Sequence, residues 1–229
     1  MPGYSHNTEK TNLIKSGNEV TLPESGSLTF RIVLFVLRPL LVGLLVAFAL
    51  YNFGDTNRYD KEIQSIAADN TIWLYLALVI FCRTITFLNG YPLVVFKKNM
   101  KGNIRVNQFI YRQIHTVEEM REAHRDTKED TVVILDEFGS TGKYNRANRS
   151  VHHMVENFGG FVASVYAISG IFPIATFSMI CLFCVGRVMH QIGYEKYGFG
   201  GHHLGFLLSK TAACIVEGLI LIVVFKAMF

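Results

Sequence analysis

Residues 146–194 read RANRSVHHMVENFGGFVASVYAISGIFPIATFSMICLFCVGRVMHQIGY. Two apolar runs flank a turn signal near Pro173, and each run carries polar residues at its outer end. If both runs are helices, the hairpin that they form brings the two polar groups to the same end. Ionisable side chains within a membrane helix are costly and mark a candidate functional site.

The polar residues of this hairpin combine cations, imidazoles, a carboxylate and a phenol. Glu156 follows Arg146 by ten residues, which places it about 15 Å deeper along a helix. The candidate site residues are Arg146, Arg149, His153 and Glu156 in the first helix, and Arg187, His190 and Tyr194 in the second.

This spacing resembles the signature of the MAPEG superfamily, which comprises the microsomal glutathione transferases and related leukotriene- and prostaglandin-forming membrane enzymes. The family patterns are RxxRxxxNxxE on one helix and RxxYxxGY on the next. The matching positions are Arg146, Arg149, Glu156, Arg187, Gly193 and Tyr194. The resemblance covers residues 146–229, with a plausible first family helix at 71–96.

The resemblance implies a four-helix membrane bundle, usually trimeric, that holds glutathione between neighbouring subunits at the cytosolic end. It implies binding of the peptide by the four candidate residues of the first helix, residues 146–156. Arg187, His190 and Tyr194 would then lie beside the sulfur as catalytic residues. Arginine suits the carboxylates of glutathione, and cations near a thiol favour its thiolate.

The sequence departs from the family at several positions. His153 replaces the family asparagine, and His190 replaces its first tyrosine. The arginine that activates the thiol in several members has no counterpart, because that region reads Gly-Gly-His-His at 200–203. A non-catalytic accessory subunit of a larger membrane complex is therefore the alternative to an enzyme.

The remaining apolar runs give an all-α integral membrane protein in which one extra N-terminal transmembrane helix precedes the MAPEG-like bundle. The chain is expected to begin with a polar tail at 1–29, followed by the extra helix at 30–53 and a polar loop at 54–70. The bundle would consist of a span at 71–96 and of residues 146–229, whose last two spans end near 194 and 229. A soluble basic loop fills 97–145, with an amphipathic helix expected at 105–126 and a short strand at 131–135.

Composition and charge restrict the class of protein. Half of the residues are hydrophobic, only 17% are charged, and the net charge is +4. No long run of Lys and Arg indicates a nucleic-acid partner. The basic loops all fall on the side of the N-terminus, which predicts that this side faces the cytosol or the matrix. We expect the endoplasmic reticulum or another organelle membrane, with the inner mitochondrial membrane possible.

Two further groups of polar residues lead to expectations. Five histidines belong to the basic end, namely His152, His153, His190, His202 and His203, and imidazole binds transition metals and haem. Adjacent histidines on a helix point about 100° apart, so we predict no metal site and keep metal or haem binding as an alternative. Arg83 lies near the middle of its span, where we expect an ion pair with Glu156 or Glu217.

The sequence thus predicts a membrane-bound glutathione transferase or peroxidase that acts on lipophilic electrophiles or lipid hydroperoxides. Glutathione would enter from the aqueous side and the lipophilic substrate from the lipid bilayer. The expected assembly is a homotrimer or a subunit of a larger membrane complex.

Overall fold

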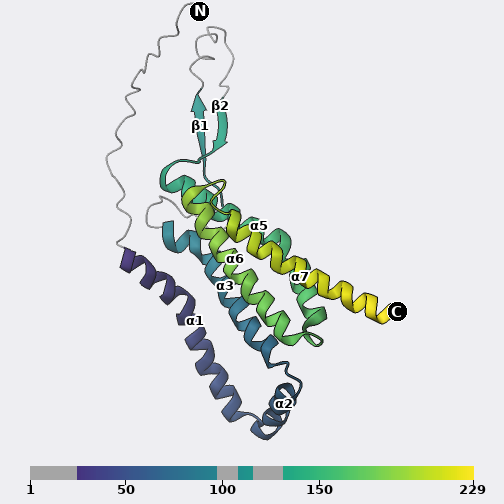
Figure 1. Ribbon diagram of the computed structural model, residues 1–229. Coiled ribbons are helices and arrows are strands. Elements are labelled where there is room, and N and C mark those ends of the chain that lie inside the picture. Colours follow the sequence, from purple (N-terminus) through teal and green to yellow (C-terminus); the bar gives the residue numbers. More distant parts are fainter. Residues whose placement is uncertain (1–24, 97–107, 116–130) are drawn as a thin grey trace, which may run out of the picture.

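The computed structural model describes residues 25–96, 108–115 and 131–229. In chain order the elements are α1 (Ser25–Phe53), α2 (Thr56–Ala68), α3 (Ile72–Phe96), β1 (Tyr111–His115), β2 (Thr131–Leu135), α5 (Gly139–Ser169), α6 (Pro173–Tyr197) and α7 (His203–Met228). Helices α3, α5, α6 and α7 form a bundle, α1 lies along its outer side, and the β-hairpin projects from one end (Figure 1).

Among the described residues, four helices are long and apolar enough to cross a membrane: α1, α3, α6 and α7. They indicate a multi-pass membrane protein, as the sequence predicted. Helix α5 is not among the four, although the sequence predicted a span there. It is 31 residues long and begins at Gly139, ahead of the predicted start at Arg146, so that its first turns are polar.

Helices α5 and α6 form the predicted hairpin. The turn consists of residues 170–172, and α6 begins with Pro173, whose fixed φ suits the first helical position. Aromatic rings fill the centre of the bundle: Phe161 of α5 stacks on Phe183 of α6 with ring centroids 4.1 Å apart, and Phe81 of α3 packs against both. This apolar core holds the bundle helices together.

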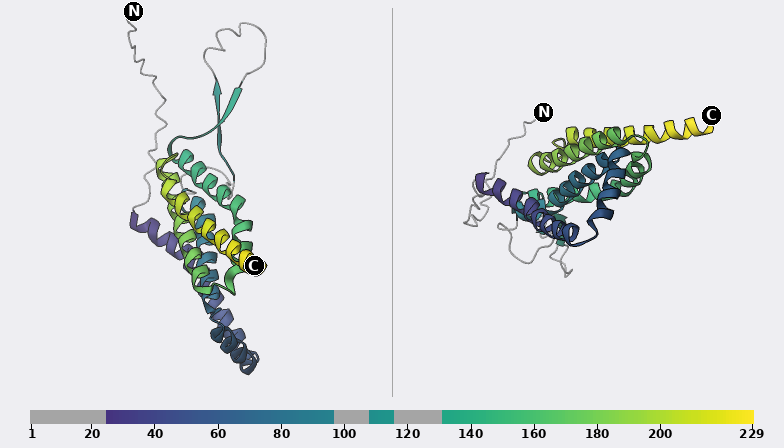
Figure 2. Two further views of the ribbon diagram at one scale, coloured as in Figure 1. Left: turned by 45° about the vertical axis from the view of Figure 1, so that its right-hand side comes forward. Right: turned by 90° about the horizontal axis from the view of Figure 1, so that it is seen from below.

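Helices α6 and α7 approach so closely that their backbones touch. A Cβ atom added to Gly186 would lie 2.6 Å from the Ser209 nitrogen and 2.8 Å from the Gly205 oxygen. A Cβ atom on Gly205 would likewise collide with the backbone of His190. Small residues at such a crossing allow the tight helix packing typical of membrane bundles. The C-terminal end of α7 extends beyond the other helices (Figure 2).

Helix α1 is fixed on α3 by one ring and two arginines. The Phe35 ring occupies the space beside Gly90 where a side chain would otherwise lie. Arg31 donates to the Val94 carbonyl oxygen over 2.7 Å. Arg83 donates to the Val36 carbonyl oxygen over 3.3 Å, so its partner is the backbone of α1 and the expected pairing with Glu156 or Glu217 is wrong.

The predicted polar loop at 54–70 is mostly helix α2, so that expectation is also wrong. Asp55 caps the helix, because its side chain accepts a hydrogen bond from the Arg58 nitrogen over 3.2 Å. Tyr51 at the end of α1 donates to Asp60 of α2, which ties the two helices together. Asn70, with φ of 57°, then reverses the chain into α3.

The segment between α3 and α5 contains an antiparallel hairpin in which Tyr111 pairs with Leu135. The predicted strand at 131–135 is confirmed as β2. The prediction of an amphipathic helix at 105–126 is wrong for Tyr111–His115, which form strand β1. Residues 105–107 and 116–126 of the predicted helix lie outside the described residues. The buried Asn145 of α5 fastens the base of the hairpin, since its amide bonds both the nitrogen and the oxygen of Ile110.

The polar tail predicted at 1–29 overlaps the first helix, because α1 already begins at Ser25. Its residues 1–24, and residues 97–107 and 116–130 of the basic loop, lie outside the described residues.

The α6–α7 contact yields a stability prediction. Gly186→Ala should lower the unfolding temperature in detergent, because the added methyl group meets the α7 backbone. Gly218→Ala is the matched control, since nothing lies within 4 Å of its added Cβ atom. The control should raise stability by up to about 1 kcal/mol through helix propensity. Equal effects of the two substitutions would contradict this packing.

The position of α5 yields a topology prediction. Because α5 lies antiparallel to α6 along the hairpin, we expect both helices to cross the membrane, which gives five crossings with α1, α3 and α7. Tags at Met1 and Phe229 should then lie on opposite sides of sealed vesicles. Protease protection measures this, and tags on the same side would mean that one of the five helices does not cross.

Candidate functional site

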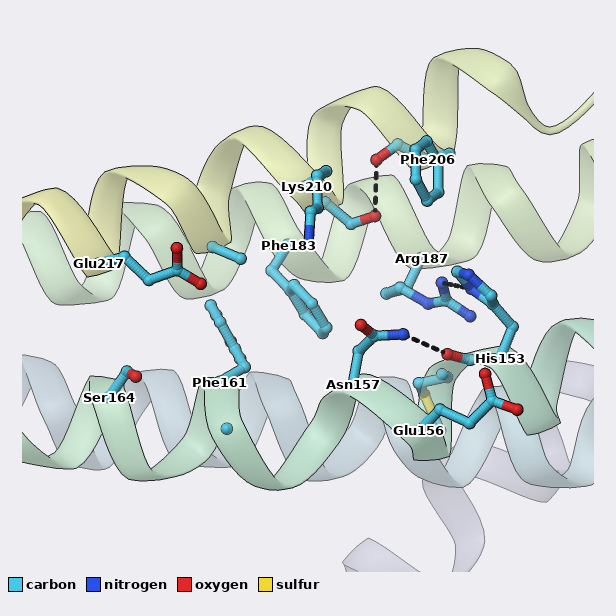
Figure 3. A pocket seen from close by; sticks show the side chains of 14 residues that line it. His153, Glu156, Asn157, Phe161, Ser164, Phe183, Arg187, Phe206, Lys210 and Glu217 are labelled. Atoms are coloured by element: carbon cyan, nitrogen blue, oxygen red, sulfur yellow. Dashed lines mark hydrogen bonds between the residues drawn. The ribbon is translucent and has the colours of Figure 1, made fainter.

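A groove of about 410 Å³ lies between α5, α6 and α7. It has charged residues of both signs along its length, with Arg187, His153 and Glu156 towards one end and Glu217 towards the other (Figure 3). The polar lining residues are His153, Glu156, Asn157, Ser164, Arg187, Ser209, Lys210 and Glu217. We call this cavity the polar groove.

Arg187 is the most buried cation of the polar groove, with only 3% of its surface exposed. Its Nη2 atom donates to the Ser150 carbonyl oxygen over 2.8 Å, and its Nη1 atom lies 3.3 Å from Nδ1 of His153. Its Nε atom is buried and has no hydrogen-bond partner among the described residues. The guanidinium is thus held in place from α5 while part of it faces the groove.

His153 and His190 connect the groove to the interior of the bundle. Their rings are stacked with centroids 5.4 Å apart and planes inclined by 5°. Nδ1 of His190 shares a hydrogen bond of 2.7 Å with the Ser150 hydroxyl group, and both residues are buried. His190 therefore lies behind His153 and does not line the groove.

A cluster of rings continues from His190 towards the end of the bundle. His202 packs edge-on against His190 and Tyr194, each with ring centroids 5.1 Å apart. Burial of the His202 ring lowers its pKa below the ordinary value of 6.5, and the neighbouring His203 lowers it further. A backbone hydrogen bond with Gly198 partly opposes these effects. The short connection between α6 and α7 thus favours a neutral imidazole at position 202.

The two predicted arginines of α5 lie away from the polar groove. Arg146 donates from Nε to the Glu195 carbonyl oxygen over 3.1 Å and from Nη1 to the Glu137 carbonyl oxygen over 3.0 Å. It therefore ties the start of α5 to the end of α6. Arg149 is exposed, and it does not line the groove.

The structure thus brings together three of the seven predicted site residues, His153, Glu156 and Arg187, in one groove. Lys210, Ser150 and Glu217 were not among the site residues predicted from the sequence. Lys210 and Glu217 are seven residues apart, which is two helical turns and one face of α7. That spacing was a usable signal, whereas the position of Ser150 beside His190 depends on packing between helices.

A second pocket of about 260 Å³ lies on the other side of Phe161, between α3, α5 and α6. Apolar and aromatic side chains line it: Leu74, Tyr75, Leu78, Phe81, Phe161, Val162, Val165, Tyr166 and Ile180. Phe161 belongs to this apolar pocket and to the polar groove alike. The Phe161 ring thus borders a charged cavity and an apolar one, and Phe183, which stacks on it, lines the charged cavity.

Within residues 25–96, 108–115 and 131–229, no group of three or more His, Cys, Asp or Glu side chains is arranged to hold a metal ion. The histidines of the ring cluster contact one another through their ring faces and edges. Such contacts differ from the convergent nitrogen atoms that a metal centre requires.

The chain matches no protein-family model, and comparisons with curated proteins and with solved structures gave no match.

The environment of His202 yields a pH prediction. Because its pKa is lower in the folded chain than in the unfolded one, protonation favours unfolding. The contribution of His202 to stability should be constant above about pH 7 and should fall as the pH drops through 6.5, the ordinary value. His202→Phe should flatten this fall, and His152→Phe, at an exposed position, should not. Thermal unfolding between about pH 5 and pH 8 measures it, and identical profiles for the two variants would refute the assignment.

Proposed function

We propose that the protein is a membrane-bound glutathione transferase or peroxidase of the MAPEG type, whose polar groove binds glutathione. The observation that carries the proposal is the mixed charge of the groove. Glutathione has two carboxylates and one ammonium group, and the groove offers Arg187 and Lys210 as cations beside Glu156 and Glu217 as anions. A volume of about 410 Å³ falls within the usual range for small-molecule sites.

The roles within the proposed site differ from those in the family signature. Arg187 is the cation best placed to bind the glutathione thiolate. Its guanidinium is fixed by the Ser150 carbonyl oxygen of α5, and its Nε–H has no hydrogen-bond partner among the described residues. Cations near a thiol favour the thiolate. His190 and Tyr194 would support His153 and the end of α6, and would not touch the ligand. Arg146 and Arg149 would not contact glutathione within one subunit.

The apolar pocket behind Phe161 fits the second, lipophilic substrate, which would enter from the bilayer. In a transfer reaction the thiolate sulfur forms a bond to the electrophilic carbon, and the leaving group departs with the bonding electron pair. In a peroxidase reaction two glutathione molecules supply two electrons and two protons, which reduce the hydroperoxide to an alcohol and water. Either reaction requires the Phe161 ring, which borders both cavities, to move.

The open side of the polar groove supports an assembly of several chains. Glu156, Lys210 and Glu217 are exposed in the single chain. Glu217 lies about 21 Å from the start of α7, near the middle of a membrane core. Charges at that depth are costly in lipid. We therefore propose that a second protein surface covers the groove, as in a homotrimer.

A specific observation favours the alternative, a non-catalytic accessory subunit. Arg146, Arg187 and His190 all bond to other groups of the same chain, which a purely structural role would also explain. Size and turnover distinguish the two functions. The enzyme should purify as a homotrimer that consumes glutathione with a lipophilic aryl halide or a lipid hydroperoxide. The accessory subunit should purify with other chains and show no turnover.

Calorimetry of glutathione binding tests the proposed site. Lys210→Gln and Glu156→Gln should each weaken binding about tenfold, as expected for losing one charge-assisted hydrogen bond. Both side chains are exposed, so the variants should fold. Glu62→Gln on α2 is the matched control and should bind like the wild type. A folded wild type that binds no glutathione would refute the proposal.

A further inference from the structure

A second charged cleft lies outside the bundle, between α1 and α3, with a volume of about 370 Å³. Its lining combines two arginines with apolar side chains: Arg31, Leu34, Phe35, Arg38, Pro39 and Val94. Among the residues that the structure describes, no acidic side chain belongs to this lining. The cleft therefore carries an excess of positive charge on a helix that is otherwise apolar.

The two arginines of the cleft share one helix face. Arg31 and Arg38 are seven residues apart, which is two turns of α1. Side chains of a helix lean towards its N-terminus, so the Arg38 guanidinium reaches towards the level of Arg31. Nη2 of Arg31 is occupied by the Val94 carbonyl oxygen. Its Nη1 atom is buried and has no hydrogen-bond partner among the described residues.

The walls of the cleft are held in place by the contact between α1 and α3. Phe35 forms part of its wall and is fixed by the space beside Gly90. Pro39, a further wall residue, cannot donate to the carbonyl group one turn earlier. Arg83 of α3 donates to the neighbouring carbonyl oxygen of Val36. Helix α1 is thus fixed at the level of both arginines.

We propose that this cleft binds an anionic phospholipid, with the phosphate on Arg31 and Arg38 and the acyl chains along α1. Guanidinium groups present paired donors that match phosphate oxygens. Arg38 lies about 20 Å from the start of α1, a depth at which a cation needs a partner or must extend towards the membrane surface. The apolar remainder of the cleft suits a lipid glycerol and acyl chains better than a free phosphate ion. Nearly the whole apolar face of α1 is exposed beside the cleft.

The position in the membrane agrees with this occupant. Arg31 lies near the start of α1, at the end of the bundle where α3 ends and α5 begins (Figure 1). The basic loops of the sequence fall on this side. Anionic lipids are enriched in the cytoplasmic leaflet, and basic pockets between transmembrane helices bind their headgroups. The site is separate from the polar groove and does not depend on glutathione binding.

Native mass spectrometry of the purified full-length chain tests the site. Phosphatidylglycerol should bind at one site at least fivefold more tightly than phosphatidylcholine, which has a phosphate but no net charge. Arg38→Gln should weaken phosphatidylglycerol binding about fivefold, and the double variant with Arg31→Gln about twentyfold. Arg58→Gln, an exposed arginine on α2, is the control and should change nothing.

Three results would overturn the proposal: equal binding of the two lipids, an Arg38→Gln variant that binds like the wild type, or an equal loss in Arg58→Gln. A large excess of inorganic phosphate separates the two sources of the anion. Phosphatidylglycerol should stay bound, and its displacement would assign the cleft to free phosphate instead. Arg38→Gln is the decisive variant, because within the described ranges Arg38 has no hydrogen bond that joins α1 to α3, whereas Arg31 also binds Val94.

Discussion

The contact on which the bundle depends is the backbone approach of α6 and α7 at Gly186 and Gly205. With no side chain between them, α7 comes close enough for its polar face to border the same cavity as α6. The next residue, Arg187, extends from α6 towards α5 and binds the Ser150 carbonyl oxygen. Two consecutive residues of α6 thus position both neighbouring helices, and the polar groove is the space that they leave.

The long apolar helices could be predicted from the sequence because a membrane span needs only length and hydropathy. The partners of the buried and half-buried arginines could not be predicted. From the sequence, an arginine inside a membrane helix is expected to pair with a carboxylate. In the structure, Arg83, Arg146 and Arg187 instead donate to backbone carbonyl oxygens. Every residue has a carbonyl group, so no pattern of side chains identifies the acceptor.

Local pattern also failed where long-range pairing decides the structure. The apolar positions near Ile110 suggest a helical period, yet β1 pairs with β2, and Asn145 holds the strand base. For the site, helical spacing singled out His153 and Glu156, and both side chains line the polar groove. It could not separate them from Arg149, because the rotation of α5 against α6 is set by packing between the two helices.

The anchoring of the hairpin by Asn145 has a mechanical consequence. Its amide occupies both hydrogen-bonding groups of Ile110, as a neighbouring strand would, and the next residue, Arg146, binds the end of α6. The hairpin is therefore attached rigidly to the first turns of α5. A force applied to β1 would therefore reach α5 through Asn145 and the end of α6 through the next residue, Arg146.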